Sequence, residues 1–251
     1  MDNLRSRIVP GMIACALIWL GTSAWAQSQA KGDGALAAAA QAPTNLVANG
    51  GFEQWRALTR NEKQSFNRSR QPNQQEQKML DGMQWPDGWF LWIGGVAQAA
   101  QWSVQDVGIL ADKTEKHAGS CSIQMDNRNH DISLSLNQRF DAAPNTRYRI
   151  TMWLKGDHID TYQPKGILVS TIASSKPGKD DNSQAGRLSL DTQFPARKEA
   201  TFDWQAFTYT FDTPPQTRTI MLCLELRGAG TLWVDDVQGT ELGKIIAVES
   251  F

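Results

Sequence analysis

The chain has 251 residues, of which 41% are hydrophobic, enough for one domain with a substantial core. Its 25 lysines and arginines almost balance its 26 aspartates and glutamates, and this balance argues against electrostatic binding to nucleic acid or to an anionic membrane. Ten tryptophans are an unusual number for a chain of this length, so the function must account for them.

Residues 1–26 are typical of a secretion signal. Arg5 and Arg7 precede the apolar run Met12–Leu20, and the small-x-small motif Ala24–Ala26 follows it. We therefore expect cleavage at the end of this motif and a secreted or periplasmic mature protein.

Two alternatives to cleavage are less favoured. An uncleaved membrane anchor needs about 20 apolar residues, and the run is shorter, so we expect no membrane span once the signal is removed. A lipid on Cys15 is the other possibility. However, apolar residues continue beyond it to Leu20, where a lipoprotein usually turns polar.

The mature chain is predicted to hold one domain. Residues 27–43 are a low-complexity leader, residues 44–243 form the domain, and a tail occupies 244–251. Two polar insertions, 56–84 and 174–200, interrupt the domain. We expect both to be solvated loops, with folding over a ligand site as the alternative.

The domain is predicted to be all-β, because short alternating runs are separated by turn residues and no long helical period or fixed repeat occurs. One face of residues 147–155 is formed by Tyr148, Ile150, Met152 and Leu154, and the other face is largely polar. The expected strands are Asn45–Val47, Gln101–Val104, Ser120–Met125, Ile132–Phe140, Arg147–Lys155, Ile167–Ile172, Trp204–Phe211, Thr219–Leu226 and Thr231–Val237.

Three motifs occur in order along the domain: Asn49–Glu53 opens it, Trp85–Trp89 follows, and Leu232–Val237 closes it, with the strands at Gly119–Ile123 and Tyr148–Gly156 between them. Together they resemble the carbohydrate-binding modules of families 4, 9 and 22, over roughly residues 45–240. The resemblance implies a jelly-roll β-sandwich of two antiparallel sheets, of galactose-binding-like type. It also implies non-catalytic binding of a poly- or oligosaccharide on the concave sheet. Both insertions depart from the family pattern.

The paired acids of the closing motif suggest a structural calcium ion. Neighbouring strand residues point to opposite faces, so one of Asp235 and Asp236 should be buried, and a buried carboxylate needs a partner. Calcium takes carboxylate and carbonyl oxygens. The resemblance implies Glu53, Asp235 and the carbonyl of Gly51 as ligands, with a further carbonyl near Gly119 possible. The alternative is that these acids cap turns or pair with basic side chains.

Sugar binding requires flat aromatic rings beside hydrogen-bonding groups. Trp153 shares a strand face with Thr151 and Lys155, and Glu225 lies opposite an apolar face in the same way. The resemblance implies that both strands face the cleft, so Trp153, Glu225 and Thr151 are the leading candidates. Trp92 and Trp102 are weaker candidates for the rim, whereas Trp89 and Trp204 are expected to be structural.

The two cysteines that remain after signal cleavage are expected to be free. Cys121 shares a face with Ile123 and Met125, while Cys223 lies opposite Leu222 and Leu224. One therefore looks inward and the other outward, although export would favour a disulfide.

Two other functions stay open. A glycosidase needs paired carboxylates, and Glu225 has no obvious partner on its strand. The spare acids are Asp157, Asp160, Asp180 and Asp181, and the three histidines, His117, His130 and His158, form no metal or nucleophile motif. An assembly or adhesion domain that holds a protein partner is the other alternative.

Overall fold

The computed structural model describes residues 44–66, 72–95, 102–162, 164–176, 183–189 and 199–245. The predicted signal and leader, and most of the tail, lie outside these residues. No helix in the described ranges is long and apolar enough to cross a membrane.

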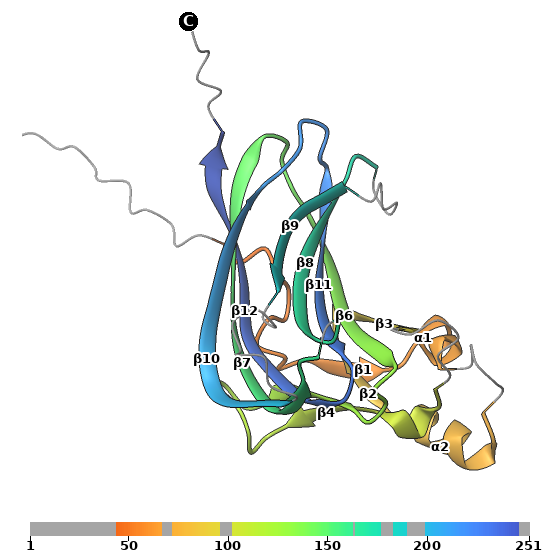
Figure 1. The fold of residues 1–251 in the computed structure, drawn as a ribbon. Helices are drawn as coiled ribbons and strands as arrows, with labels where there is room; N and C mark the ends of the chain where they lie inside the picture. Colours follow the sequence, from red (N-terminus) through yellow and green to blue (C-terminus); the bar gives the residue numbers. More distant parts are fainter. Residues whose placement is uncertain are drawn as a thin grey trace, which may run out of the picture. The chain divides into compact units, whose positions relative to one another are not determined.

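Ten strands form two antiparallel sheets of five, which confirms the all-β jelly-roll sandwich (Figure 1). The order β3-β6-β11-β8-β9 defines what we call the β11 sheet, and the order β10-β7-β12-β5-β4 defines the β7 sheet. The strand bounds are β1 Trp55–Ala57, β2 Gln84–Pro86, β3 Phe90–Gly95, β4 Val107–Asp112, β5 Ser122–Asn127, β6 Ile132–Asp141, β7 Thr146–Asp160, β8 Gly166–Ser174, β9 Ser183–Ser189, β10 Glu199–Asp212, β11 Thr219–Arg227 and β12 Gly230–Lys244.

The core lies between the inner faces of the two sheets. Alternation along β7 buries Ile150, Met152 and Leu154, each 0% exposed. On β11, Leu222 and Leu226 are buried in the same way. Each side chain of this size stabilises the fold by about 1.5–3 kcal/mol, so the predicted inner faces supply the main driving force.

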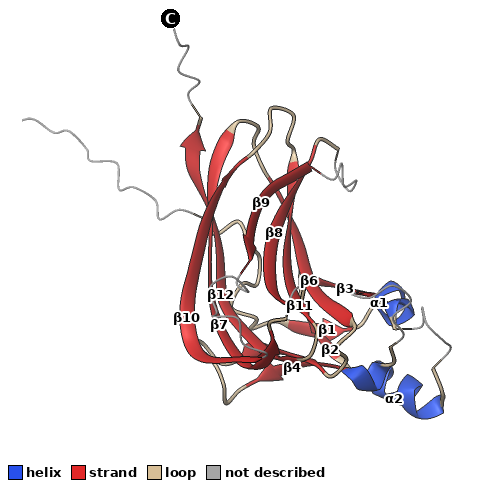
Figure 2. Ribbon diagram, in the orientation of Figure 1, coloured by secondary structure: helices blue, strands red, loops and turns tan. Residues whose placement is uncertain are grey.

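The first insertion was predicted to be a solvated loop, and this prediction is wrong. The insertion carries the helices α1 (Arg60–Ser65) and α2 (Gln74–Gly82), drawn blue in Figure 2. Each begins with a capping box, formed by Thr59 with Glu62 and by Asn73 with Glu76. Both glutamates are buried. These helices escaped prediction because they are short and their polar residues act as caps.

Other boundaries also differ from the predictions. Residues 45–47 are not a strand. In place of the strand predicted at 101–104, a 3-10 turn, η1 (Val104–Asp106), leads into β4, which was not predicted. The strands β1, β2, β3 and β9 were missed as well, and β9 lies inside the second insertion.

The opening segment lies against the last strand, as the resemblance implied. The amide of Val237 donates to the carbonyl of Gly50 at 2.9 Å, and the amide of Leu46 donates to the carbonyl of Gly239 at 2.9 Å. A Cβ on Gly50 would lie 1.9 Å from the carbonyl oxygen of Val237, so only glycine permits this close approach.

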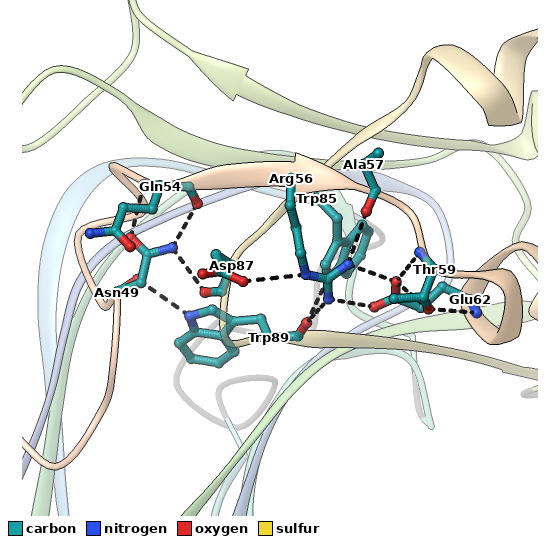
Figure 3. Close-up of polar contacts among 9 residues, drawn as sticks. All are labelled: Asn49, Gln54, Arg56, Ala57, Thr59, Glu62, Trp85, Asp87 and Trp89. Carbon is teal, nitrogen blue, oxygen red and sulfur yellow. Dashed lines mark hydrogen bonds and ion pairs between the residues drawn. The ribbon is translucent and has the colours of Figure 1, made fainter.

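Side-chain bonds join the opening motif to the second motif (Figure 3). The Nδ2 of Asn49 donates to the carbonyls of Gln54 at 2.8 Å and Asp87 at 3.0 Å, and the indole of Trp89 donates to the carbonyl of Asn49 at 3.3 Å. Trp89 is buried, so its predicted structural role is confirmed.

Arg56 extends this network to α1 through a bidentate pair with Glu62, at 2.8 and 2.9 Å (Figure 3). Burial alone would raise the pKa of Glu62, but the hydrogen bonds from Arg56 and Thr59 outweigh it and lower that pKa. The network therefore fixes the inserted helix to the sandwich.

Candidate functional site

The outer face of the β11 sheet carries a row of four side chains across its strands. Trp92 on β3 lies opposite Ser135 on β6, which lies opposite Glu225 on β11, which lies opposite Leu168 on β8. Directly opposed residues point to the same side of a sheet. Trp92 and Glu225 are thus two strand spacings apart, roughly 10 Å.

The indole of Trp92 lies along its strand, over Gly94. A Cβ on Gly94 would be 1.9 Å from Cη2 of the ring, so the backbone of β3 forms a floor for it. The side chain is still 43% exposed. One face of the ring therefore rests on the strand while much of the side chain stays open. Gly94 was not among the predicted site residues. A glycine two residues after a tryptophan lies on the same strand face, and this spacing could have indicated that the ring rests on the backbone there.

Polar groups fill the centre of this face. Arg227 donates from Nε to Oε2 of Glu225 at 2.9 Å, and the hydroxyl of Ser133 donates to the same oxygen at 3.4 Å. Both of these bonds use Oε2, and Oε1 has no hydrogen bond to a described residue. Asn137 accepts from the hydroxyl of Ser135 at 2.8 Å. Small hydroxyl and amide groups thus separate an aromatic ring from a carboxylate.

Trp153 lies elsewhere. It projects from the outer face of the β7 sheet, whereas Glu225 projects from the outer face of the β11 sheet. The predicted cleft formed by Trp153 and Glu225 together is therefore wrong, because the two strands belong to opposite layers. The imidazole of His117 stacks on Trp153, with ring centroids 3.7 Å apart and an interplanar angle of 13°. One face of this indole is already covered.

The remaining predicted sugar residues also separate. Thr151 lies on β7 opposite Thr208 and Gln238, on the same face as Trp153 and away from Glu225. Trp102 is half-buried and packs against the core. Trp204 is half-buried and lies 6.2 Å from His117, ring to ring. The five predicted residues thus divide into Trp92 with Glu225 on the β11 sheet, Trp153 with Thr151 on the β7 sheet, and Trp102 apart from both.

The junction of the opening and closing motifs is built around the loop 113–121. Asp235 is 1% exposed, and its Oδ2 accepts from the amides of His117 at 2.9 Å and Ala118 at 3.0 Å. Its Oδ1 accepts from the amide of Asp236 at 2.8 Å. Burial raises the pKa of Asp235 despite these three bonds. One of the two carboxylates is therefore buried, as expected, but it lies on the outer face of the β7 sheet, directly opposite Trp153 and beneath the loop, rather than in the interior.

Glu53 contacts the same loop from the other side. The amide of Ser120 donates to Glu53 at 2.8 Å, and the Ser120 hydroxyl also bonds to it; the hydroxyl bond is the larger cause of the lowered pKa of Glu53. A Cβ on Gly51 would lie 3.9 Å from both Glu53 Cγ and Asp236 Oδ1. Among the described residues no group of three or more His, Cys, Asp or Glu side chains is placed to hold a metal, so any ion here would also need backbone carbonyls.

Both cysteines are buried and free, as expected, and the thiol of Cys121 donates to the carbonyl of Phe52 at 3.2 Å. Two acids at the end of β7 that were considered for a glycosidase form ion pairs with nearby side chains. Asp157 pairs with His158 at 2.8 Å, and Asp160 pairs with His130 and Lys165, each at 3.1 Å. Asp180 and Asp181 lie outside the described residues.

No family model matches the chain, and no curated protein matches its sequence. Solved structures similar to it include the enzymatically active domain of bacteriophage CBA120 tailspike protein 4, at 12% identity over 62% of this chain, with a TM-score of 0.45; the match covers 20% of the tailspike chain. A carbohydrate-binding module described as CBM4 is 18% identical over 78% of this chain and 99% of its own, with a TM-score of 0.45. A putative sugar binding protein from Bacteroides thetaiotaomicron VPI-5482 is 11% identical over 79% of this chain and 100% of its own, with a TM-score of 0.43.

Proposed function

We propose that the protein binds a poly- or oligosaccharide, without cleaving it, on the outer face of the β11 sheet. The observation that carries this proposal is the row formed by Trp92, Ser135 and Glu225. A sugar ring would stack its C–H face on the open side of Trp92. Its hydroxyls, or those of the next sugar, would donate to Oε1 of Glu225. We take this face as the counterpart of the concave sheet that the resemblance implied.

The alternatives are less well supported by the same face. Glu225 is held by Arg227 and Ser133, and no second carboxylate is opposed to it in the rows of the described strands. An inverting or retaining glycosidase needs two such groups, about 5 to 9.5 Å apart. A role in binding therefore fits Glu225 better than a role in acid–base chemistry.

The test is affinity electrophoresis of the exported protein through gels that contain soluble polysaccharides. We expect retardation by at least one of them and no release of reducing ends. Trp92→Ala should weaken retention by about tenfold or more, the loss expected when an aromatic contact worth about 1.4 kcal/mol is removed.

Trp153→Ala is the matched control, because it removes the same side chain from the other sheet. Its retention should equal that of the unmodified protein. Equal retention by Trp92→Ala and loss in Trp153→Ala would move the site to the β7 sheet and contradict the proposal.

We also propose a structural calcium ion at the junction, held by Glu53, Asp235 and the carbonyl of Gly51. A divalent cation would relieve the burial of Asp235, whose pKa is raised, and would balance the charge of Glu53. Its role would be to hold the first and last segments of the domain together.

Melting temperatures with calcium and with a chelator test this ion. A ligand at a hundred times its Kd adds about 2.7 kcal/mol to the folded state, which raises the Tm by several degrees. Glu53→Gln should reduce that rise. An identical Tm in millimolar calcium and in chelator would contradict calcium binding.

Export remains part of the proposal, and it rests on the pattern of residues 1–26. Expression of the full chain in a bacterium should yield a periplasmic or secreted protein whose mass lacks these residues. Recovery of the intact chain from the membrane fraction would favour the anchor instead.

A further inference from the structure

A long groove runs beside β4, on the other sheet from the proposed sugar site. It encloses about 900 Å³ and is lined by β4 on one side and by α2 with the segment before β2 on the other (Figure 1). The six residues of β4 give it a length of roughly 20 Å. This length suits an extended chain better than a compact small molecule.

One side of β4 has no strand partner in the described part of the chain. The strand pairs only with β5, from Val107 opposite Asn127 to Asp112 opposite Ser122. The amide of Val107 donates to the carbonyl of Val104 in η1, and the backbone groups of 108–112 make no hydrogen bond to any other described segment. An edge strand of this kind presents N–H and C=O groups that an added strand can pair with.

The groove walls are apolar, but the exposed side chains are aliphatic and thioether groups rather than the flat aromatic rings that bind sugars. Leu110 on β4 is 49% exposed and Met79 on α2 is 40% exposed. Trp55 and Met83 are partly buried between them, against the core. Aliphatic and thioether side chains suit the side chains of a peptide, and methionine in particular adapts to varied partners.

The charged groups at the groove are unbalanced. Lys78 on α2 and Lys113 after β4 are exposed, and neither has an ion pair with any described residue. Arg128 is already paired with Asp126 at 2.5 Å. The single acid, Glu53, is bound to Ser120. Two positive charges that have no ion pair among the described residues therefore lie beside an apolar groove.

We infer that this groove docks an extended, acidic segment of a partner protein, which adds a strand to the β7 sheet along β4. The backbone edge supplies hydrogen bonds, the apolar walls take alternate side chains, and the two lysines select acidic residues between them. A second copy of this chain is a poorer occupant, because two such grooves would bring four unpaired lysines together. The inference does not depend on sugar binding.

Titration of the ¹⁵N-labelled protein with two defined peptides tests the inference by NMR. One is an acetylated and amidated heptapeptide of alternating glutamate and valine, and the other replaces each glutamate with lysine. We expect the acidic peptide to shift the amide signals of 107–112 in a saturable manner and the basic peptide to leave them in place. No saturable shift at millimolar acidic peptide, or equal binding of both peptides, would overturn the inference.

Charge reversal locates the binding. The double variant Lys78→Glu/Lys113→Glu should bind the acidic peptide about tenfold more weakly, with an unchanged Tm, because neither side chain has an ion pair with a described residue. The matched control is Lys176→Glu/Arg218→Glu, which makes the same change in charge at a separate pocket that contains no residue of β4 or α2. Equal weakening in both variants would show only a general effect of net charge and would overturn the site.

Two further probes separate the other occupants. An oligogalacturonide that shifts 107–112 more strongly than the peptide would assign the groove to an anionic sugar. Self-association that is lost in Leu110→Gln, measured by analytical ultracentrifugation, would assign it to a second copy. Either result would overturn the inference of a protein segment.

Discussion

The two outer faces of the sandwich carry similar residues in different states. Trp92 on the β11 sheet lies over a glycine and stays 43% exposed, with a carboxylate two strands away. Trp153 on the β7 sheet is stacked beneath His117, and the loop that supplies this histidine is held down by Asp235. An aromatic ring near an acid is therefore exposed on one sheet and covered on the other.

The difference lies in what the acids bind. Glu225 uses Oε2 for Arg227 and Ser133, and no described residue bonds to its other oxygen. Asp235 uses both oxygens for backbone amides of the covering loop and its neighbour. Asp235 therefore anchors a loop of the fold, with acceptor sites left for a cation, whereas Glu225 is held by two side chains.

The largest expected effect comes from breaking the covered face at Asp235. Asp235→Ala removes the acceptor of three amide bonds and should lower the free energy of unfolding by about 3 kcal/mol. Urea denaturation measures the change. The control, Asp212→Ala, removes an exposed acid paired with Arg147 and should cost far less. Similar losses in both variants would mean that Asp235 does not anchor the loop.

The next largest effect is a difference in the free energy of unfolding lost when Trp153 and Trp92 are each replaced. Trp153→Ala should cost about 2 kcal/mol, since it removes the stack with His117 and half-buried surface. Trp92→Ala should cost less, about 1 kcal/mol, because much of its ring already faces solvent. Chemical denaturation of the two variants side by side gives the comparison. A larger cost for Trp92 would show that its ring is packed rather than presented.

The layered fold could be predicted because alternation along β7 and β11 records burial directly. Alternation says which side of a strand a residue takes, but not which sheet the strand joins. For that reason Trp153 and Glu225 were both correctly placed on outward faces and wrongly placed in one cleft. Sheet membership depends on pairing between distant strands, such as Glu225 with Ser135, and no local pattern encodes that pairing.

The junction was easier to predict than the open face. Its motifs lie at the two ends of the domain and contain glycine and acid residues whose backbone demands are visible in sequence. The covering loop was not predicted, because its contacts with Asp235 and Glu53 use backbone amides rather than distinctive side chains. The role of Gly94 was missed because a glycine within a strand more often marks a bulge.

A smaller effect, on polysaccharide binding, tests how Trp92 is held on the outer face of the β11 sheet. Gly94→Ala places a Cβ where the end of the Trp92 ring lies, so the ring must move off the strand. Retention by polysaccharide should weaken by about threefold to tenfold, less than in Trp92→Ala. Gly82→Ala on α2 is the control, since a Cβ there meets nothing within 4 Å. Unchanged retention in Gly94→Ala would mean that the orientation of Trp92 does not matter for binding.

The smallest expected effect is a pH dependence that distinguishes the two acids. Burial raises the pKa of Asp235 above the ordinary aspartate value of about 3.9, so in the window between these two values the folded protein binds more protons than the unfolded chain. Its contribution to the free energy of unfolding should therefore fall as the pH rises through the folded pKa. Denaturation of the unmodified protein and of Asp235→Asn from about pH 3.5 to 7 isolates this contribution, because the two proteins share every other titratable group. The opposite result is a difference in free energy of unfolding between the two proteins that grows with pH. It would mean that the hydrogen bonds of the covering loop stabilise the ionised form of Asp235 more than burial destabilises it. The junction would then need no cation to offset that charge.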